Sequence, residues 1–149
     1  MEAPIAVGSD HAGLELKRKI LARLTALGRP FDDLGTDGEA SVDYPDYAAK
    51  VGRAVAAGSH PLGILVCGSG IGMSIAANKI AGVRAAHCSN ELEGRLARAH
   101  NDANVLCLGA RTLGGEVALA IVDLFLAGHF DAGRHARRVA KIVALEGAP

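Results

Sequence analysis

Residues 63–79, GILVCGSGIGMSIAANK, constrain the fold of this chain more than any other segment. The segment begins with an unbroken apolar run that Cys67 closes, which is typical of a strand buried on both faces of a parallel sheet. Glycines then follow at alternate positions, Gly68, Gly70 and Gly72. A helical pattern begins at Met73, so the segment predicts a strand, a glycine turn and a helix in succession.

This glycine turn indicates an anion site beside a thiol. Glycines allow backbone N–H groups to turn toward a bound oxygen, and a helix N-terminus adds a partial positive charge. Cys67 lies at the mouth of the turn, where the same field stabilises a thiolate, the nucleophilic and basic form of cysteine. The alternative is a turn that serves strand–helix packing only, with Cys67 as a small buried apolar residue.

Several familiar motifs do not fit the turn. A P-loop requires Gly-Lys-Ser/Thr, whereas Gly72 is followed by Met73 and Ser74. The dinucleotide-binding fingerprint would need a glycine at Met73, and a phosphatase Cys-x5-Arg loop would need an arginine there. The serine in Gly68-Ser69-Gly70 lacks the pattern of a hydrolase nucleophile elbow.

Short apolar runs alternate with helical patterns along the whole chain. Strands are predicted at 5–7, 30–34, 64–67, 83–88 and 104–108, and helices at 14–27, 46–57, 73–80, 91–99, 116–127 and 135–145. In the first helix Lys17 is predicted to lie on the solvent side, opposite the leucine and isoleucine stripe. This alternation predicts a single α/β domain, doubly wound around a parallel sheet, with 30–34 at a sheet edge.

Composition excludes several classes of function. The 149 residues suit one domain, and 16 basic residues balance 16 acidic ones, which argues against a nucleic-acid partner. The three cysteines, Cys67, Cys88 and Cys107, are too widely spaced for a disulfide framework or a zinc site, and no other metal motif is present. The chain has no basic leader and no apolar run of membrane-spanning length, so we expect a cytoplasmic protein without a membrane partner.

Polar residues gather where the predicted strands end. Asp10 and His11 follow the first strand, Cys67 and Ser69 the third, and Arg111 the fifth. Because ligands of open α/β sheets bind at the carboxyl ends of the strands, these side chains predict a ligand site. For Asp10 the alternative is a capping role at the start of the first helix.

Two further features have both a functional and a structural interpretation. His100 precedes the fifth strand and could act as an acid or base, or could lie at a helix C-terminus, where it favours the dipole. Arg134 and Arg138 are four residues apart, so on a helix they share one face. Two guanidinium groups suit a phosphate, but a solvated basic face is the alternative.

Six motifs together resemble the type B ribose-5-phosphate isomerases and the related subunits of galactose-6-phosphate isomerase. They cover nearly the whole chain: GSDHAG at 8–13, DYP at 43–45, CGSGIG at 67–72, AANK at 76–79, HNDAN at 100–104 and GRH at 133–135. The resemblance implies a five-stranded Rossmann-like domain in a homodimer or tetramer whose active sites are shared between subunits. It also implies a sugar phosphate as the small-molecule partner and no metal or other cofactor.

The resemblance implies the interconversion of ribose 5-phosphate and ribulose 5-phosphate through an enediolate. Cys67 would move the proton between carbons 1 and 2, Ser69 would shuttle protons between the oxygens, and His100 would open the sugar ring. The enediolate would be held by the backbone amides of Gly68, Ser69, Gly70, Ile71 and Gly72. Sugar hydroxyls would be bound by Asp10, Tyr44 and Asn101, and the phosphate by His11, Arg111, Arg134 and Arg138. Some members have a glutamate where Met73 stands here, so this chain resembles the branch that uses the cysteine.

Two alternatives stay open at this point. The substrate could be another aldose phosphate, of the allose 6-phosphate or galactose 6-phosphate type. The chain could also be a phosphate-binding regulatory module without catalysis, although such a module would need neither Cys67 nor His100.

Overall fold

Five parallel strands form one sheet at the centre of the computed structural model, which describes residues 2–147. In chain order they are β1 (Ile5–Ser9), β2 (Phe31–Asp33), β3 (Gly63–Cys67), β4 (Ala85–His87) and β5 (Val105–Gly109). Their order across the sheet is β2-β1-β3-β5-β4. This arrangement confirms the predicted doubly wound α/β domain and places β2 at an edge.

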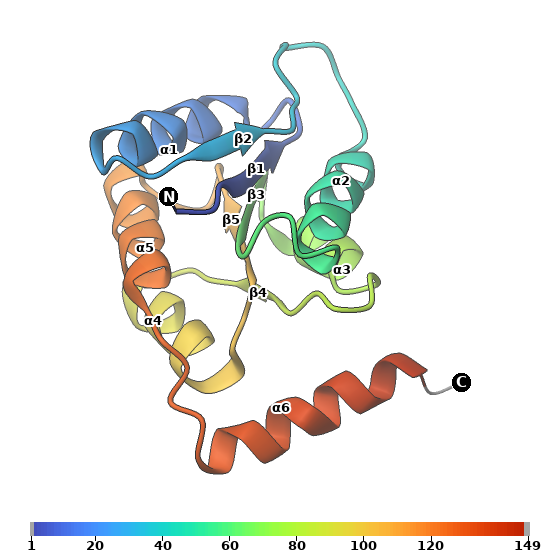
Figure 1. Ribbon diagram of the computed structural model, residues 1–149. Coiled ribbons are helices and arrows are strands. Elements are labelled where there is room, and N and C mark those ends of the chain that lie inside the picture. Colours follow the sequence, from blue (N-terminus) through green and yellow to red (C-terminus); the bar gives the residue numbers. More distant parts are fainter. Residues whose placement is uncertain (1, 148–149) are drawn as a thin grey trace.

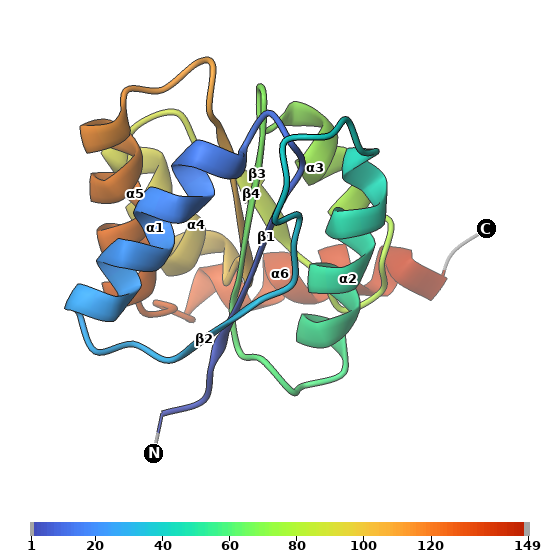
Figure 2. The same ribbon diagram turned by 90° about the horizontal axis from the view of Figure 1, so that it is seen from above.

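Helices cover both faces of the sheet. They are α1 (Leu14–Ala26), α2 (Tyr44–Ala56), α3 (Ile71–Ala77), α4 (Glu91–Asn101), α5 (Gly115–Ala127) and α6 (Arg134–Ala144), followed by a 3₁₀ turn at Leu145–Gly147. Figure 2 shows α1, α4 and α5 on one side of the sheet and α2 and α3 on the other. Helix α6 runs past the β4 edge, outside both helix layers (Figure 1).

The three central strands are buried along their entire length, as their apolar runs predict. Every residue of β1, β3 and β5 is buried. On one face the core is formed with α1, α4 and α5, where Ile20 and Phe125 are fully buried, and on the other with α2 and α3, where Val51 and Met73 are. This packing on both faces fixes the height at which each strand ends and therefore where the side chains after it lie.

Several boundaries differ from the prediction. Helix α2 begins at Tyr44, two residues early, because Pro45 in its first turn needs no hydrogen-bond partner for its nitrogen. Helix α3 begins at Ile71, directly after the glycine turn. Strand β4 is shorter than 83–88, because the Arg84 N–H donates to the side chain of Asn104 (2.7 Å). Helix α4 continues through His100 to Asn101 and ends at Asp102, whose φ is 46°.

The capping interpretation of Asp10 is wrong. Helix α1 has Gly13 as its N-cap, and no side chain caps it. Asp10 instead accepts a hydrogen bond from the Gly13 N–H (2.9 Å) and so closes the turn between β1 and α1. Gly13 packs directly on β3, where an added Cβ would lie 2.4 Å from the Val66 carbonyl oxygen.

The prediction for Lys17 is also wrong. Its side chain is 1% exposed, and its ammonium group lies 2.6 Å from Asp33 Oδ1 at the end of β2. Helical periodicity placed Lys17 opposite the leucine stripe, but β2 and the loop after it cover that side of α1. A carboxylate that lies 16 residues away in the sequence allows the charge to be buried.

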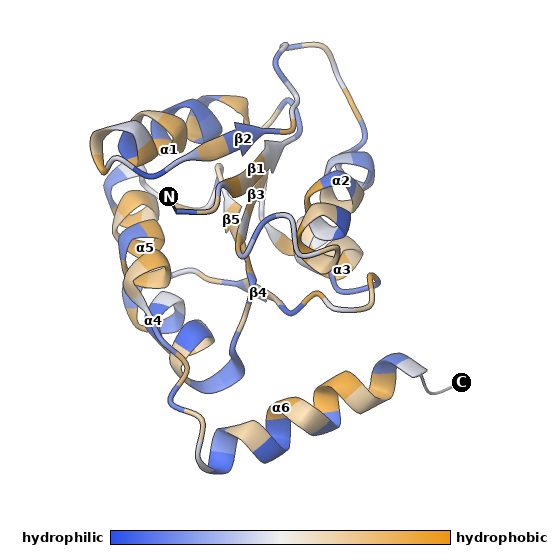
Figure 3. Cartoon of the chain, viewed as in Figure 1, coloured by the Kyte–Doolittle hydropathy of each residue, from blue (hydrophilic) through white to orange (hydrophobic). Residues whose placement is uncertain are grey.

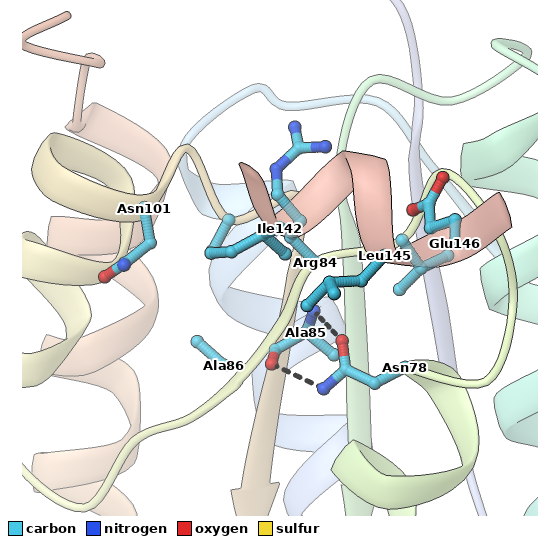
Figure 4. Close-up of a pocket in the computed structure, with 10 residues that line it drawn as sticks. Asn78, Arg84, Ala85, Ala86, Asn101, Ile142, Leu145 and Glu146 are labelled. Carbon is cyan, nitrogen blue, oxygen red and sulfur yellow. Dashed lines mark hydrogen bonds between the residues drawn. The ribbon is translucent and has the colours of Figure 1, made fainter. Parts of the chain in front are cut away.

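An asparagine side chain closes the β4 edge of the sheet. Asn78, the C-cap of α3, accepts a hydrogen bond from the Ala85 N–H (2.8 Å) and donates one to the Ala85 carbonyl (2.9 Å). Figure 4 shows these two bonds as a closed ring between the side chain and the strand. The backbone groups of Ala85 that would otherwise face an additional strand are therefore satisfied.

Helix α6 exposes much of its apolar surface. Of its eleven residues only Val139 is buried, whereas Ile142 is 44% exposed and Val143 41% exposed. Figure 3 shows apolar and polar residues interleaved along this helix. A helix with this pattern normally packs its apolar side against another surface.

Candidate active site

A cavity of about 640 Å³ opens at the carboxyl ends of the central strands. It lies beside the turns that follow β1 and β3, the two neighbouring strands between which the strand order reverses, where doubly wound folds bind ligands. The cavity is lined by Asp10, His11, Ala12, Tyr44, Cys67, Gly68, Ser69, Ile71, Gly72, Ile75, Arg111 and Thr112. Most of the site residues implied by the sequence are therefore brought together.

Cys67 is the last residue of β3 and lies at the wall of this cavity, 5% exposed. Its Sγ atom accepts a hydrogen bond from the Gly70 N–H (3.2 Å). Ser69 makes a similar local bond, because its Oγ atom accepts one from the Ile71 N–H (3.2 Å). The thiol and the hydroxyl are thus oriented by amides of the same turn.

The turn has its shape because two of its positions require glycine. Gly70 has φ 78°, and a Cβ there would lie 2.9 Å from the Leu108 carbonyl carbon. At Gly72 a Cβ would lie 2.3 Å from the ring of Tyr44. The first residue of α2 therefore packs directly on the first turn of α3, which places the tyrosine at the cavity.

Arg111 supplies the positive charge of this cavity. Its backbone N–H donates to the Gly68 carbonyl (2.8 Å), and its guanidinium packs over Gly68, where Nη1 lies 3.1 Å from the position of an added Cβ. A cation beside the backbone amides of the glycine turn suits an anionic ligand.

Of the three free thiols only Cys67 lines the cavity. Burial, with a smaller effect of Glu93, raises the pKa of Cys88 to about 12. Burial also raises the pKa of Cys107 strongly. These two thiols stay protonated at neutral pH, which leaves Cys67 as the candidate base.

Five residues implied by the resemblance do not line this cavity. They are Gly70, buried within the glycine turn, His100 and Asn101, at the end of α4, and Arg134 and Arg138, on α6. Asn101 instead lines a separate cavity of about 560 Å³ between β4 and the C-terminal segment (Figure 4). The two arginines are exposed on a helix that lies beyond the sheet edge (Figure 1).

His100 has a partner that the sequence did not indicate. Its ring stacks on that of His135, with centroids 4.2 Å apart and planes 12° from parallel. Burial and the proximity of His100, followed by Arg134 and Arg138, lower the pKa of His135. The lowered pKa favours the neutral ring of His135, and the stacked pair joins the end of α4 to the start of α6.

Sequence reasoning also missed residues of the cavity itself. Thr112 follows Arg111 and could have been found by the same strand-end argument. Ile75 lies one turn beyond Ile71 on α3, and both are more than half exposed, at 58% and 52%.

Within residues 2–147, no three His, Cys, Asp or Glu side chains lie together as a possible metal site. No helix in this described part is long and apolar enough to cross a membrane.

Residues 5–142 match the family model described as Ribose/Galactose Isomerase. The chain belongs to the Ribose/Galactose Isomerase family. Ribose-5-phosphate isomerase B of Escherichia coli K12 is 49% identical over 142 residues, which is 95% of each chain.

Solved structures are also similar to this chain over nearly its whole length. Ribose-5-phosphate isomerase B of Clostridium thermocellum is 51% identical with a TM-score of 0.95, over 96% of this chain and 97% of its own. The enzyme of Mycoplasma genitalium, solved with bound ribulose 5-phosphate, is 43% identical with a TM-score of 0.95, over 100% of this chain and 99% of its own.

Proposed function

We propose that this chain is a ribose-5-phosphate isomerase that interconverts ribose 5-phosphate and ribulose 5-phosphate. The observation that carries the proposal is the position of the Cys67 thiol. It accepts a hydrogen bond from an amide of the glycine turn and lines a cavity that is also lined by Arg111. The similar proteins of E. coli and C. thermocellum are both named ribose-5-phosphate isomerase B, which supports this reaction. The buried free thiols suit a reducing compartment, so we place the enzyme in the cytoplasm.

The proposed chemistry is a proton transfer through an enediolate. The Cys67 thiolate removes the proton from carbon 2 of the open-chain aldose, and the electron pair of that bond moves toward the carbonyl oxygen. Backbone amides of residues 68–72 stabilise the negative oxygen. The Ser69 hydroxyl moves a proton between the oxygens on carbons 1 and 2, and Cys67 returns its proton to carbon 1, which gives the ketose.

The remaining groups are proposed to come from a second copy of the chain. Helix α6 leaves Ile142 and Val143 exposed, and the mouth of the cavity leaves Ile71 and Ile75 exposed, so both surfaces have apolar area to cover. A symmetric dimer that covers both would bring one copy's His100 and Arg134 toward its partner's Cys67 cavity. There His100 would open the furanose ring, Asn101 would hold sugar hydroxyls, and Arg134 and Arg138 would bind the phosphate with His11 and Arg111.

The activity is tested by incubating the purified chain with ribose 5-phosphate and measuring ribulose 5-phosphate. We expect turnover that is unchanged after exhaustive chelation, because the proposed chemistry needs only a thiol, amides and cations. Allose 6-phosphate and galactose 6-phosphate serve as comparison substrates. Preference for either of these would assign a different substrate, and binding without turnover of any of the three would identify a regulatory module.

The shared site makes a prediction about Arg134. Arg134→Ala should raise KM for ribose 5-phosphate about 10- to 100-fold, the effect of losing one charge-assisted hydrogen bond to phosphate, with a smaller change in kcat. Arg137→Ala, an exposed neighbour on α6, is the matched control and should leave KM unchanged.

Mixed dimers then show which copy supplies the arginine. When Arg134→Ala and Cys67→Ala chains are refolded together, about one-quarter of the wild-type sites should be regenerated at low substrate, because half of the dimers are mixed and each has one intact site. No recovery in dimers shown to be mixed would place Arg134 and Cys67 of the same copy in one site.

A further inference from the structure

Lys17 is a buried cation that the proposed chemistry does not use. It lies on α1 with 1% of its side chain exposed, although lysine is rarely buried to this extent. Its Nζ donates to Asp33 Oδ1 (2.6 Å) and to the Thr36 carbonyl oxygen. Because a buried ammonium is strongly unfavourable without such acceptors, these contacts hold the start of the loop after β2 in one position.

The loop after β2, which Lys17 contacts, is hydrogen-bonded to Ser9, the last residue of β1. The Ser9 N–H donates to the Gly35 carbonyl, and the Thr36 N–H donates to the Ser9 carbonyl, both at 2.5 Å. Asp33 contributes as well, because its Oδ1 also accepts from the Gly35 N–H (2.9 Å). Lys17 therefore fixes the backbone immediately before Asp10 and His11, two residues of the Cys67 cavity.

The far end of the same loop contacts His11. Residues 37–41 are mostly exposed, and the chain then returns to the body at Val42, whose N–H donates to His11 Nδ1 (3.1 Å). A backbone amide can only donate, so Nδ1 is an acceptor, and the neutral ring carries its proton on Nε2. This tautomer gives His11 an N–H donor for an anionic oxygen in the cavity.

We propose that Lys17 is a positioning residue that, through the loop from Asp33 to Val42, holds His11 in the Nε2–H tautomer required to donate to the substrate phosphate. The substrate part of this inference rests on the proposed function. Within this loop Thr36 is held by Lys17 and Ser9, and Val42 contacts His11 directly before Asp43, the N-cap of α2. Only residues 37–41 separate Thr36 from Val42, so a shift at Thr36 changes the path by which the chain reaches Val42 and the position of the N–H that contacts His11.

The direct test is the tautomer of His11, measured by long-range ¹H–¹⁵N NMR in the full chain. The wild type and Lys19→Met, which changes an exposed lysine of the same helix, should show His11 as the Nε2–H form. Lys17→Met, which keeps the buried length but removes the donor, should show a mixture of tautomers. Val42→Pro removes the N–H that contacts His11 and should give the same mixture, while Lys17→Arg should retain part of the wild-type form.

The kinetic test separates positioning from general loss of structure. In Lys17→Met we expect KM for ribose 5-phosphate and Kd for inorganic phosphate to rise about tenfold, with kcat changed much less, because one hydrogen bond to phosphate is weakened. If Lys17→Met does not fold, Asp33→Asn tests the same link from a side chain that is 34% exposed, and it should shift the tautomer in the same direction. A single Nε2–H tautomer in the folded Lys17 or Asp33 variant would overturn the proposal. Absence of isomerase activity in the wild type would instead refute the proposed function, and the tautomer comparison would still decide the role of Lys17.

Discussion

Replacement of Cys67 by alanine should lower kcat for ribose 5-phosphate by about 10²- to 10⁴-fold, the usual contribution of a positioned base. KM should change little, because Sγ contacts the amide of Gly70 and the phosphate is proposed to be bound by other residues. The fold should survive, since alanine fills most of the volume of a cysteine. Steady-state kinetics together with a thermal melt measure both effects.

Cys88→Ala is the matched control for the loss of a thiol. Cys88 is 1% exposed and belongs to the core on the other face of the sheet, and burial keeps its thiol protonated. This variant should retain turnover and should still be inactivated by a thiol-alkylating reagent, with substrate protecting it. Near-normal turnover in Cys67→Ala would remove Cys67 from the mechanism.

The second large effect is expected at Gly70. In Gly70→Ala a side chain is forced into a left-handed conformation at φ 78°, and its Cβ would meet the backbone of Leu108 and Gly109 at 2.9 and 3.1 Å. The turn must then shift, and its amides leave the positions that would hold the enediolate. We expect kcat to fall by about 10²- to 10³-fold, the effect of losing an oxyanion contact, together with a lower melting temperature.

A second glycine-to-alanine change controls for the substitution itself. Gly114 precedes α5 with φ −68°, and an added Cβ there meets nothing within 4 Å. Gly114→Ala should keep both turnover and melting temperature. Wild-type kcat in Gly70→Ala would mean that the amides of this turn do not stabilise the transition state.

The central part of the fold could be predicted because its signals are local. Unbroken apolar runs identified the buried strands, and the glycines after Cys67 identified the turn that shapes the cavity. Asp10 and Arg111 were expected to lie together because they follow parallel strands, whose carboxyl ends meet at one edge of the sheet, and both line the Cys67 cavity.

The remainder depended on contacts that periodicity does not contain. Lys17 was predicted to face solvent because the helical pattern has no information about β2, which brings Asp33 to it. His100 and Arg134 were implied by resemblance to belong to one site, whereas within one copy they lie away from the cavity. A sequence pattern predicts which residues share a helix or strand. It does not predict whether residues on different elements meet within one copy of the chain or between two copies.

The ring between Asn78 and Ala85 bears on how two copies can associate. An asparagine side chain occupies the backbone groups with which a strand from another molecule would pair, and the opposite edge, β2, is only three residues long and carries Asp32 and Asp33. The sheets of two copies are thereby discouraged from joining into one continuous sheet. Contacts between two copies would then have to be made by helices and loops, and each domain would keep a separate sheet.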